Sequence, residues 1–244
     1  MLREFAKIYS TMVYSKAGRR LHALAEDARE SGKFLEALEY TDQATLAYEK
    51  DNDLFGLAEI QSSRQSTFKH LYRTTGDKVF LILEKHAAEA AVEIARESGI
   101  KEAIGIPYHN LGKYYFEVEE YEKAAEAFKR AVENLTRYSN SGHGRQSVVA
   151  DIKGHQYAAE YHAGDKTALD RALDALGELK NAEEPNSYFK SAWLSGAHLR
   201  ITEMVAQDNP ELAKKHLEEA RRIIKGDERL ILRKDQLEKL EKSL

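Results

Sequence analysis

The sequence contains no cysteine, which excludes disulfide bonds, thiolate metal sites and cysteine nucleophiles. Proline is also scarce, with three residues among 244, and no Ser/Gly-rich stretch marks a linker. No apolar run approaches the length of a membrane-spanning helix, and charged residues interrupt the N-terminal stretch where a secretory signal would need an apolar core. We therefore expect one continuous body, located in the cytoplasm and without a membrane partner.

The charge is balanced. Charged residues make up 32% of the chain, yet both signs are well mixed and the formal net charge is only -4. A nucleic-acid-binding protein usually presents a strongly basic face. Nucleic acid is therefore not an expected partner.

A repeat of small residues runs through the whole sequence. In two segments an aromatic residue precedes a small residue by three positions, and another small residue follows seven positions later: Phe34, Ala37 and Ala44, and Tyr121, Ala124 and Ala131. The seven-residue offset recurs as Leu81 with Ala88, Leu169 with Leu176, and Ala213 with Ala220. The anchors at 37, 81, 124, 169 and 213 are separated by 44, 43, 45 and 44 residues. This near-constant period indicates repeated units of two helices and two turns.

Turn-forming residues between the expected helices divide the chain into five expected units. They cover about residues 8–50, 52–97, 101–138, 144–180 and 186–225, and residues 226–244 form an expected capping helix with Leu230, Leu237 and Leu240 inward. Within the expected helices, apolar residues recur at three- and four-residue spacing, and no alternating strand pattern competes. One helix pair cannot bury both of its faces, so stacking of neighbouring pairs is expected.

The third unit resembles the tetratricopeptide repeat (TPR) family. Its matching positions are Tyr108, Leu111-Gly112, Tyr115, Ala124, Phe128 and Ala131. The family unit has 34 residues, so units of 43 to 45 resemble the longer repeats of kinesin light chains and bacterial peptide-pheromone receptors. The resemblance implies an all-α, right-handed TPR-like superhelical solenoid with about five helix-turn-helix repeats and a C-terminal cap. It also implies a scaffold or adaptor that binds a protein or peptide, without a cofactor.

In TPR proteins the first helix of each pair lines a concave groove, and this resemblance selects the candidate peptide-binding residues. They are His22, Glu26, Arg29, Ser66, His70, Arg73, His109, Asn110, Lys113, Phe116, Tyr161, His162 and His198. Their side chains suit hydrogen bonding to a peptide backbone, and the cations suit binding of carboxylates. The alternative is that they are simply solvated polar faces. The family's two-carboxylate clamp is not reproduced, since only Asn110 and Lys113 resemble parts of it.

Two other functions remain open at this stage. One is a peptide-responsive regulator similar to bacterial pheromone receptors but lacking their effector module. The other is a phosphatase-type enzyme in which Gln61 or Gln65 would orient a water molecule. We expect no catalytic residues and no metal site, because His155, Glu160 and His162 lie too far apart along one helix to share an ion.

The N-terminal residues carry an apolar stripe, formed by Leu2, Phe5, Ile8, Tyr9, Met12 and Val13. It extends beyond what its own helix partner could cover. It is expected to pack along the second pair, and the alternative is a homodimer contact through the N-terminal helix.

Overall fold

The computed structural model describes residues 14–139 and 144–243, and every regular element in these ranges is a helix. The apolar stripe expected at the N-terminus lies outside the described residues. Contacts divide the chain into two compact units, one running to Pro107 and the other from Tyr108 onward, with the three residues Glu30–Gly32 grouped with the second. No helix in the described ranges combines the length and apolar character needed to cross a membrane.

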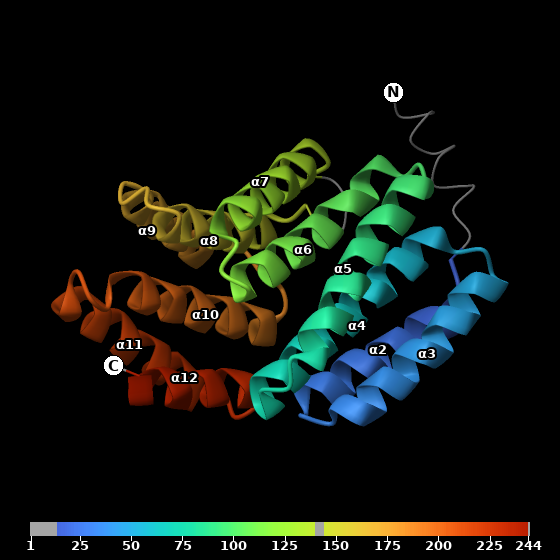
Figure 1. Cartoon of the computed structure of the whole chain (residues 1–244), viewed down its shortest axis with the longest axis horizontal. Coiled ribbons are helices and arrows are strands. Elements are labelled where there is room, and N and C mark those ends of the chain that lie inside the picture. Colours follow the sequence, from blue (N-terminus) through green and yellow to red (C-terminus); the bar gives the residue numbers. More distant parts are fainter. Residues whose placement is uncertain (1–13, 140–143, 244) are drawn as a thin grey trace. The chain divides into compact units, whose positions relative to one another are not determined.

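In the part of the first unit that the structure describes there are four long helices and a short 3-10 turn. Their bounds are α2 (Lys16–Glu30), α3 (Phe34–Lys50), α4 (Leu54–Thr75), α5 (Val79–Glu97) and η1 (Lys101–Ile104). Figure 1 shows them in blue to green. Gly76 ends α4 with a φ of 72° and donates its N–H to the Tyr72 carbonyl at 2.7 Å. Glycine adopts this left-handed conformation without a steric penalty, which explains why α4 ends at this position.

The centre of the first unit is the ring of Tyr48 on α3, which has no exposed surface. It lies against Gly18 of α2 and Gly56 of α4, and a Cβ atom at either glycine would overlap the ring. Asp53 caps α4 by accepting the Gly56 N–H at 2.8 Å, and its other oxygen accepts the Ser15 N–H at 3.1 Å. One aromatic ring and one carboxylate therefore join three successive helices.

The described residues of the second unit form seven helices. They are α6 (Gly105–Glu117), whose first three residues belong to the first unit, α7 (Tyr121–Arg137), α8 (Gln146–His162), α9 (Ala168–Asn181), α10 (Ser187–Val205), α11 (Pro210–Lys225) and α12 (Ile231–Ser243). Consecutive helices α7 to α9 pack in sequence, α10 packs on α11, and α10 also contacts α8 and α9 (Figure 1). This is the pairwise packing of stacked helical hairpins.

Small residues permit this close packing. Ala124, Phe128 and Ala131 of α7 have no exposed surface, and Gly112 of α6 lies under the Phe128 ring. Of the two contact residues expected in α9, Leu176 is buried at 5% exposed, whereas Leu169 is half-buried. Its neighbour Ala168 has no exposed surface, because an alanine lets neighbouring helices approach more closely than a leucine does.

The C-terminal helix α12 packs on α10 and α11. Leu230, Leu237 and Leu240, which were expected to face inward, are buried together with Leu199, Ala220 and Ile224. The helix itself begins at Ile231, after a turn in which the Leu230 N–H bonds to the Asp227 carbonyl at 3.1 Å.

Candidate functional site

The candidate residues of α2 mainly connect this helix to α3 and α4. His22 lies with Nδ1 3.3 Å from the Tyr48 hydroxyl, and burial lowers the pKa of its imidazole. Arg29 donates to the Ser63 hydroxyl of α4 at 2.8 Å. Glu26 is the exposed member of the set. These side chains therefore contribute to packing within the first unit, and Glu26 is the most accessible to a ligand.

The candidate residues of α4 are half-buried. Ser66 donates its hydroxyl to the Ser62 carbonyl of its own helix at 3.2 Å. The His70 ring stacks in parallel on Phe34 of α3, with centroids 5.8 Å apart. Arg73 lies in the last turn of α4, where a cation interacts favourably with the helix dipole.

Tyr161 and His198 are buried, as are His109 and Asn110, which corrects the expectation that these candidates of the second unit face a ligand. Tyr161 is 4% exposed and donates its hydroxyl to Asp208 at 2.7 Å. His198 is 2% exposed and bonds to His216 of α11. Each polar group has a partner inside the protein, so polarity alone was a poor guide to exposure at these positions.

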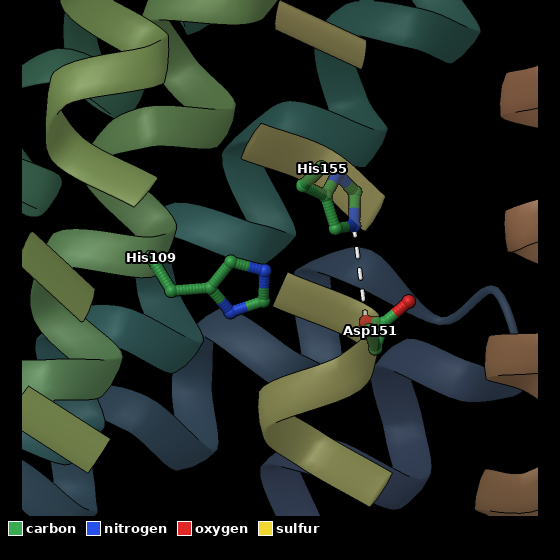
Figure 2. Close-up of side chains that lie close together, drawn as sticks. All are labelled: His109, Asp151 and His155. Carbon is green, nitrogen blue, oxygen red and sulfur yellow. Dashed lines mark ion pairs between the residues drawn. The ribbon is translucent and has the colours of Figure 1, made fainter. Parts of the chain in front are cut away.

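A buried polar network joins α6, α8 and α10. Figure 2 shows the His109 ring of α6 directed toward Asp151 and His155, which lie one turn apart on α8. The centroids of the His109 and His155 rings are 5.2 Å apart, and Phe128 stacks on His155 at 5.3 Å. Arg200 of α10 donates to Asp151 at 2.6 Å and to His155 Nε2 at 2.8 Å. We call these four polar residues, His109, Asp151, His155 and Arg200, the histidine–arginine network.

The network has the residue types of a zinc site, since potential ligand atoms of His109, Asp151 and His155 lie within 4.8 Å of one another. The contacts of Arg200 favour an interpretation other than a zinc site. Its guanidinium already donates to the carboxylate and to one imidazole nitrogen, so it supplies the positive charge that an ion would bring. The network is therefore best explained as a clamp between helices, and Asp151 and Arg200 are members that the sequence analysis missed.

An aromatic cluster lies toward the end of α6. It consists of Phe116, Tyr121 and His162, from α6, α7 and α8, and we call it the three-ring patch. Phe116 meets Tyr121 at 5.3 Å and His162 at 5.6 Å edge to face, and Tyr121 stacks on His162 at 5.1 Å. His162 is exposed and the other two rings are half-buried. Burial and the nearby Lys166 lower the pKa of His162, so its ring is neutral at neutral pH.

Polar candidates lie on the same helix as Phe116. Lys113 precedes it by three residues, a spacing that puts both on one helix face. Lys113 is half-buried and donates to the buried Asn110 side chain at 3.3 Å. His109 is 7% exposed, so it supports this surface from below rather than forming part of it.

Of the two residues of the phosphatase-type alternative, Gln61 is half-buried and Gln65 is buried. Gln65 has no exposed surface and donates to the equally buried Glu84 at 2.5 Å. It therefore cannot orient a water molecule toward a bound substrate. In the trio His155, Glu160 and His162, Glu160 pairs with Arg171 at 2.7 Å and His162 belongs to the three-ring patch.

Comparison with known proteins gives the fold a name. No protein-family model matches the sequence, and no curated protein matches it. Among solved structures, BtubC (BKLC) from P. vanneervenii is similar with a TM-score of 0.62 and 19% identity, covering 85% of this chain and 80% of that one.

Two further structures come from a Podosopora anserina putative kinesin light chain with nearly identical TPR-like repeats. The first has a TM-score of 0.51 and 17% identity, covering 86% of this chain and 96% of that one. A variant form of the same protein has a TM-score of 0.52 and 17% identity, covering 84% of this chain and 93% of that one. The resemblance found in the third unit is thus confirmed at the level of the fold, and this chain has the fold of a TPR-type helical repeat protein.

Proposed function

We propose that this chain is a protein-interaction scaffold and that the second unit binds a protein or peptide partner at the three-ring patch and Lys113. The observation that carries the proposal is the patch itself. Three aromatic rings from three successive helices converge, and one of them is exposed. The similarity to TPR-like repeat structures supports a general role in protein interaction.

The chemistry of the surface indicates what it binds. Aromatic rings offer a large contact area at low cost in side-chain entropy, and such residues often dominate binding energies at interfaces. Lys113, one turn before Phe116 on α6, provides a cation for a carboxylate. The partner segment is therefore expected to present an apolar or aromatic side chain next to an aspartate, a glutamate or a C-terminal carboxylate.

The histidine–arginine network supports this surface. It connects α8 and α10 through charge-assisted hydrogen bonds of 2.6 and 2.8 Å, and the His109 ring of α6 packs on His155 with centroids 5.2 Å apart. His109 lies one turn before Lys113 on α6, so fixing His109 also fixes the face that carries Lys113 and Phe116. Preorganisation of this kind lowers the cost of ordering side chains on binding.

The proposal can be tested by affinity capture from cells of the source organism with the unchanged chain and with the double variant Lys113→Glu, His162→Ala. The double variant reverses the cation and removes the exposed ring without touching the buried network. We expect it to retain its helical circular dichroism and melting temperature and to bind the captured partner at least about tenfold more weakly.

A matched control is Lys129→Glu with His86→Ala, since both residues are exposed and lie outside the patch. The control should bind as the unchanged chain does. Equal binding by the unchanged chain and by Lys113→Glu, His162→Ala would show that the partner uses another surface.

A further inference from the structure

Helices α10 and α11 meet through two buried histidines. His198 is 2% exposed and His216 is 6% exposed, and their Nδ1 atoms are 2.9 Å apart. Because an imidazole nitrogen either donates or accepts, one ring donates its Nδ1 proton and the other accepts it. The bond exists only while at least one of the two Nδ1 atoms lacks a proton.

The charges around the pair oppose protonation. Lys180 of α9 and Lys215 and Arg222 of α11 are positive. Glu219 is the carboxylate that favours the protonated form, but it is itself held by Arg222 at 2.8 Å. From α12, Arg233 lies against Gly196 and donates to the Ala192 carbonyl at 3.0 Å, which adds a further cation beside α10.

Burial and these cations both disfavour the protonated form of the two histidines. Burial first, and then the nearby charges, lower the pKa of His198 to about 4, and burial and lysines lower the pKa of His216 as well. The two rings are therefore neutral in the folded protein at neutral pH. In the unfolded chain they would take up protons near pH 6.5.

The pair lies beside the apolar cluster that holds the C-terminal end. Leu199, the neighbour of His198, packs with Ala220 of α11 and with Leu237 and Leu240 of α12. A second link between α10 and α11 is the Thr202 hydroxyl, 3.3 Å from the Ala213 carbonyl. Separation of the two histidines would thus loosen α11 and, with it, the helix α12 that packs on both.

We propose that His198 and His216 form an acid-sensitive latch, which keeps α11 on α10 at neutral pH and releases α11 and α12 when the pair takes up protons. Release uncovers the leucine-rich cluster. Both histidines bind protons less readily in the folded state, so the latch is fully closed above about pH 6.5 and weakens as the pH falls toward about 4. For His198 alone, the opening equilibrium should rise about 20-fold between pH 7 and pH 5.

Hydrogen exchange measured by mass spectrometry on the full chain, at pH 7.5 and pH 5.0 and corrected for intrinsic exchange rates, tests the latch. Protection of residues 210–225 and 231–243 should fall at least about tenfold at pH 5.0, while residues 121–137 of α7 should keep theirs. Unchanged protection of α11 and α12 at pH 5.0 would overturn the proposal.

The double variant His198→Gln, His216→Gln removes both titrating rings and keeps a donor and an acceptor at each position. Its α11 and α12 protection should no longer depend on pH in this range. The control His86→Gln removes an exposed histidine of α5 and should behave as the unchanged chain does. A folded double variant that keeps the full acid response would refute the latch.

If the double variant fails to fold, nuclear magnetic resonance of the unchanged chain tests the latch proposal. The imidazole signals of His198 should stay in their neutral form in the closed state down to pH 5, and those of His216 should titrate below the ordinary histidine range. Titration of both rings near pH 6.5 in the folded protein would contradict the proposal.

Discussion

At the scale of single residues, the packing depends on glycines that lie under aromatic rings. A Cβ atom at Gly112 would be 2.7 Å from the Phe128 ring, which has no exposed surface and no room to move. We therefore expect Gly112→Ala to lower the free energy of unfolding by about 1–3 kcal/mol, measured by chemical denaturation.

Gly177 of α9 is the control for this change. A Cβ atom there would meet no neighbouring atom within 4 Å. Gly177→Ala should leave stability unchanged or raise it by up to about 1 kcal/mol through better helix propensity. Equal effects of the two substitutions would contradict the close contact of α6 with α7.

The ion pair of the histidine–arginine network leads to a second prediction. Asp151 and Arg200 have side chains that are 7% and 11% exposed. Arg200→Met would leave the Asp151 carboxylate buried without its cation, at a cost of about 3–5 kcal/mol in unfolding free energy. Adding Asp151→Asn should restore much of this loss. A double-mutant cycle by denaturation measures the coupling, and additive effects would argue against a direct pair.

Some polar side chains are buried and not exposed, and this limits prediction of the site from the sequence. His109, Tyr161 and His198 look like surface residues in the sequence, yet each is buried at 7%, 4% and 2% exposed. Their burial depends on partners from other helices, such as His216, which no local pattern reveals. The spacing of Asp151 and His155 by four residues was the one local sign of the network.

At the scale of helices, the sequence predicts most breaks. Gly32, Gly76 and Gly164 all have positive φ and lie between helices, a conformation that glycine adopts without a steric penalty. The register of α9 was harder to predict, because Ala168 and Leu169 both fit a three- and four-residue period. Only the approach of a neighbouring helix selects the smaller side chain.

The turn between α6 and α7 gives a prediction at this scale. Glu119 has a φ of 62°, a left-handed conformation that disfavours side chains with a Cβ atom. Glu119→Gly should raise the free energy of unfolding by about 0.5–1 kcal/mol in denaturant titrations. Glu120→Gly is the matched control, since its φ of -82° offers no such relief. A gain with Glu120→Gly but none with Glu119→Gly would be the contrary result.

At the scale of the whole molecule, the fold could be predicted because a near-constant repeat period constrains many residues at once. Similarity to solved TPR-like repeats with TM-scores of 0.51 to 0.62 agrees with that inference, although identity is only 17–19%. The binding surface was less predictable. Phe116, Lys113 and His162 were expected to face a ligand, whereas the contribution of Tyr121 depends on how α7 follows α6.

The central claim is that a partner protein contacts the three-ring patch, and site-specific photocrosslinking in cells of the source organism tests it most directly. A photoreactive phenylalanine analogue at position 116 should give a discrete covalent adduct with another protein. The same analogue at Asp174, an exposed residue of α9, should give none. Adducts at position 174 but not at position 116 would contradict the account.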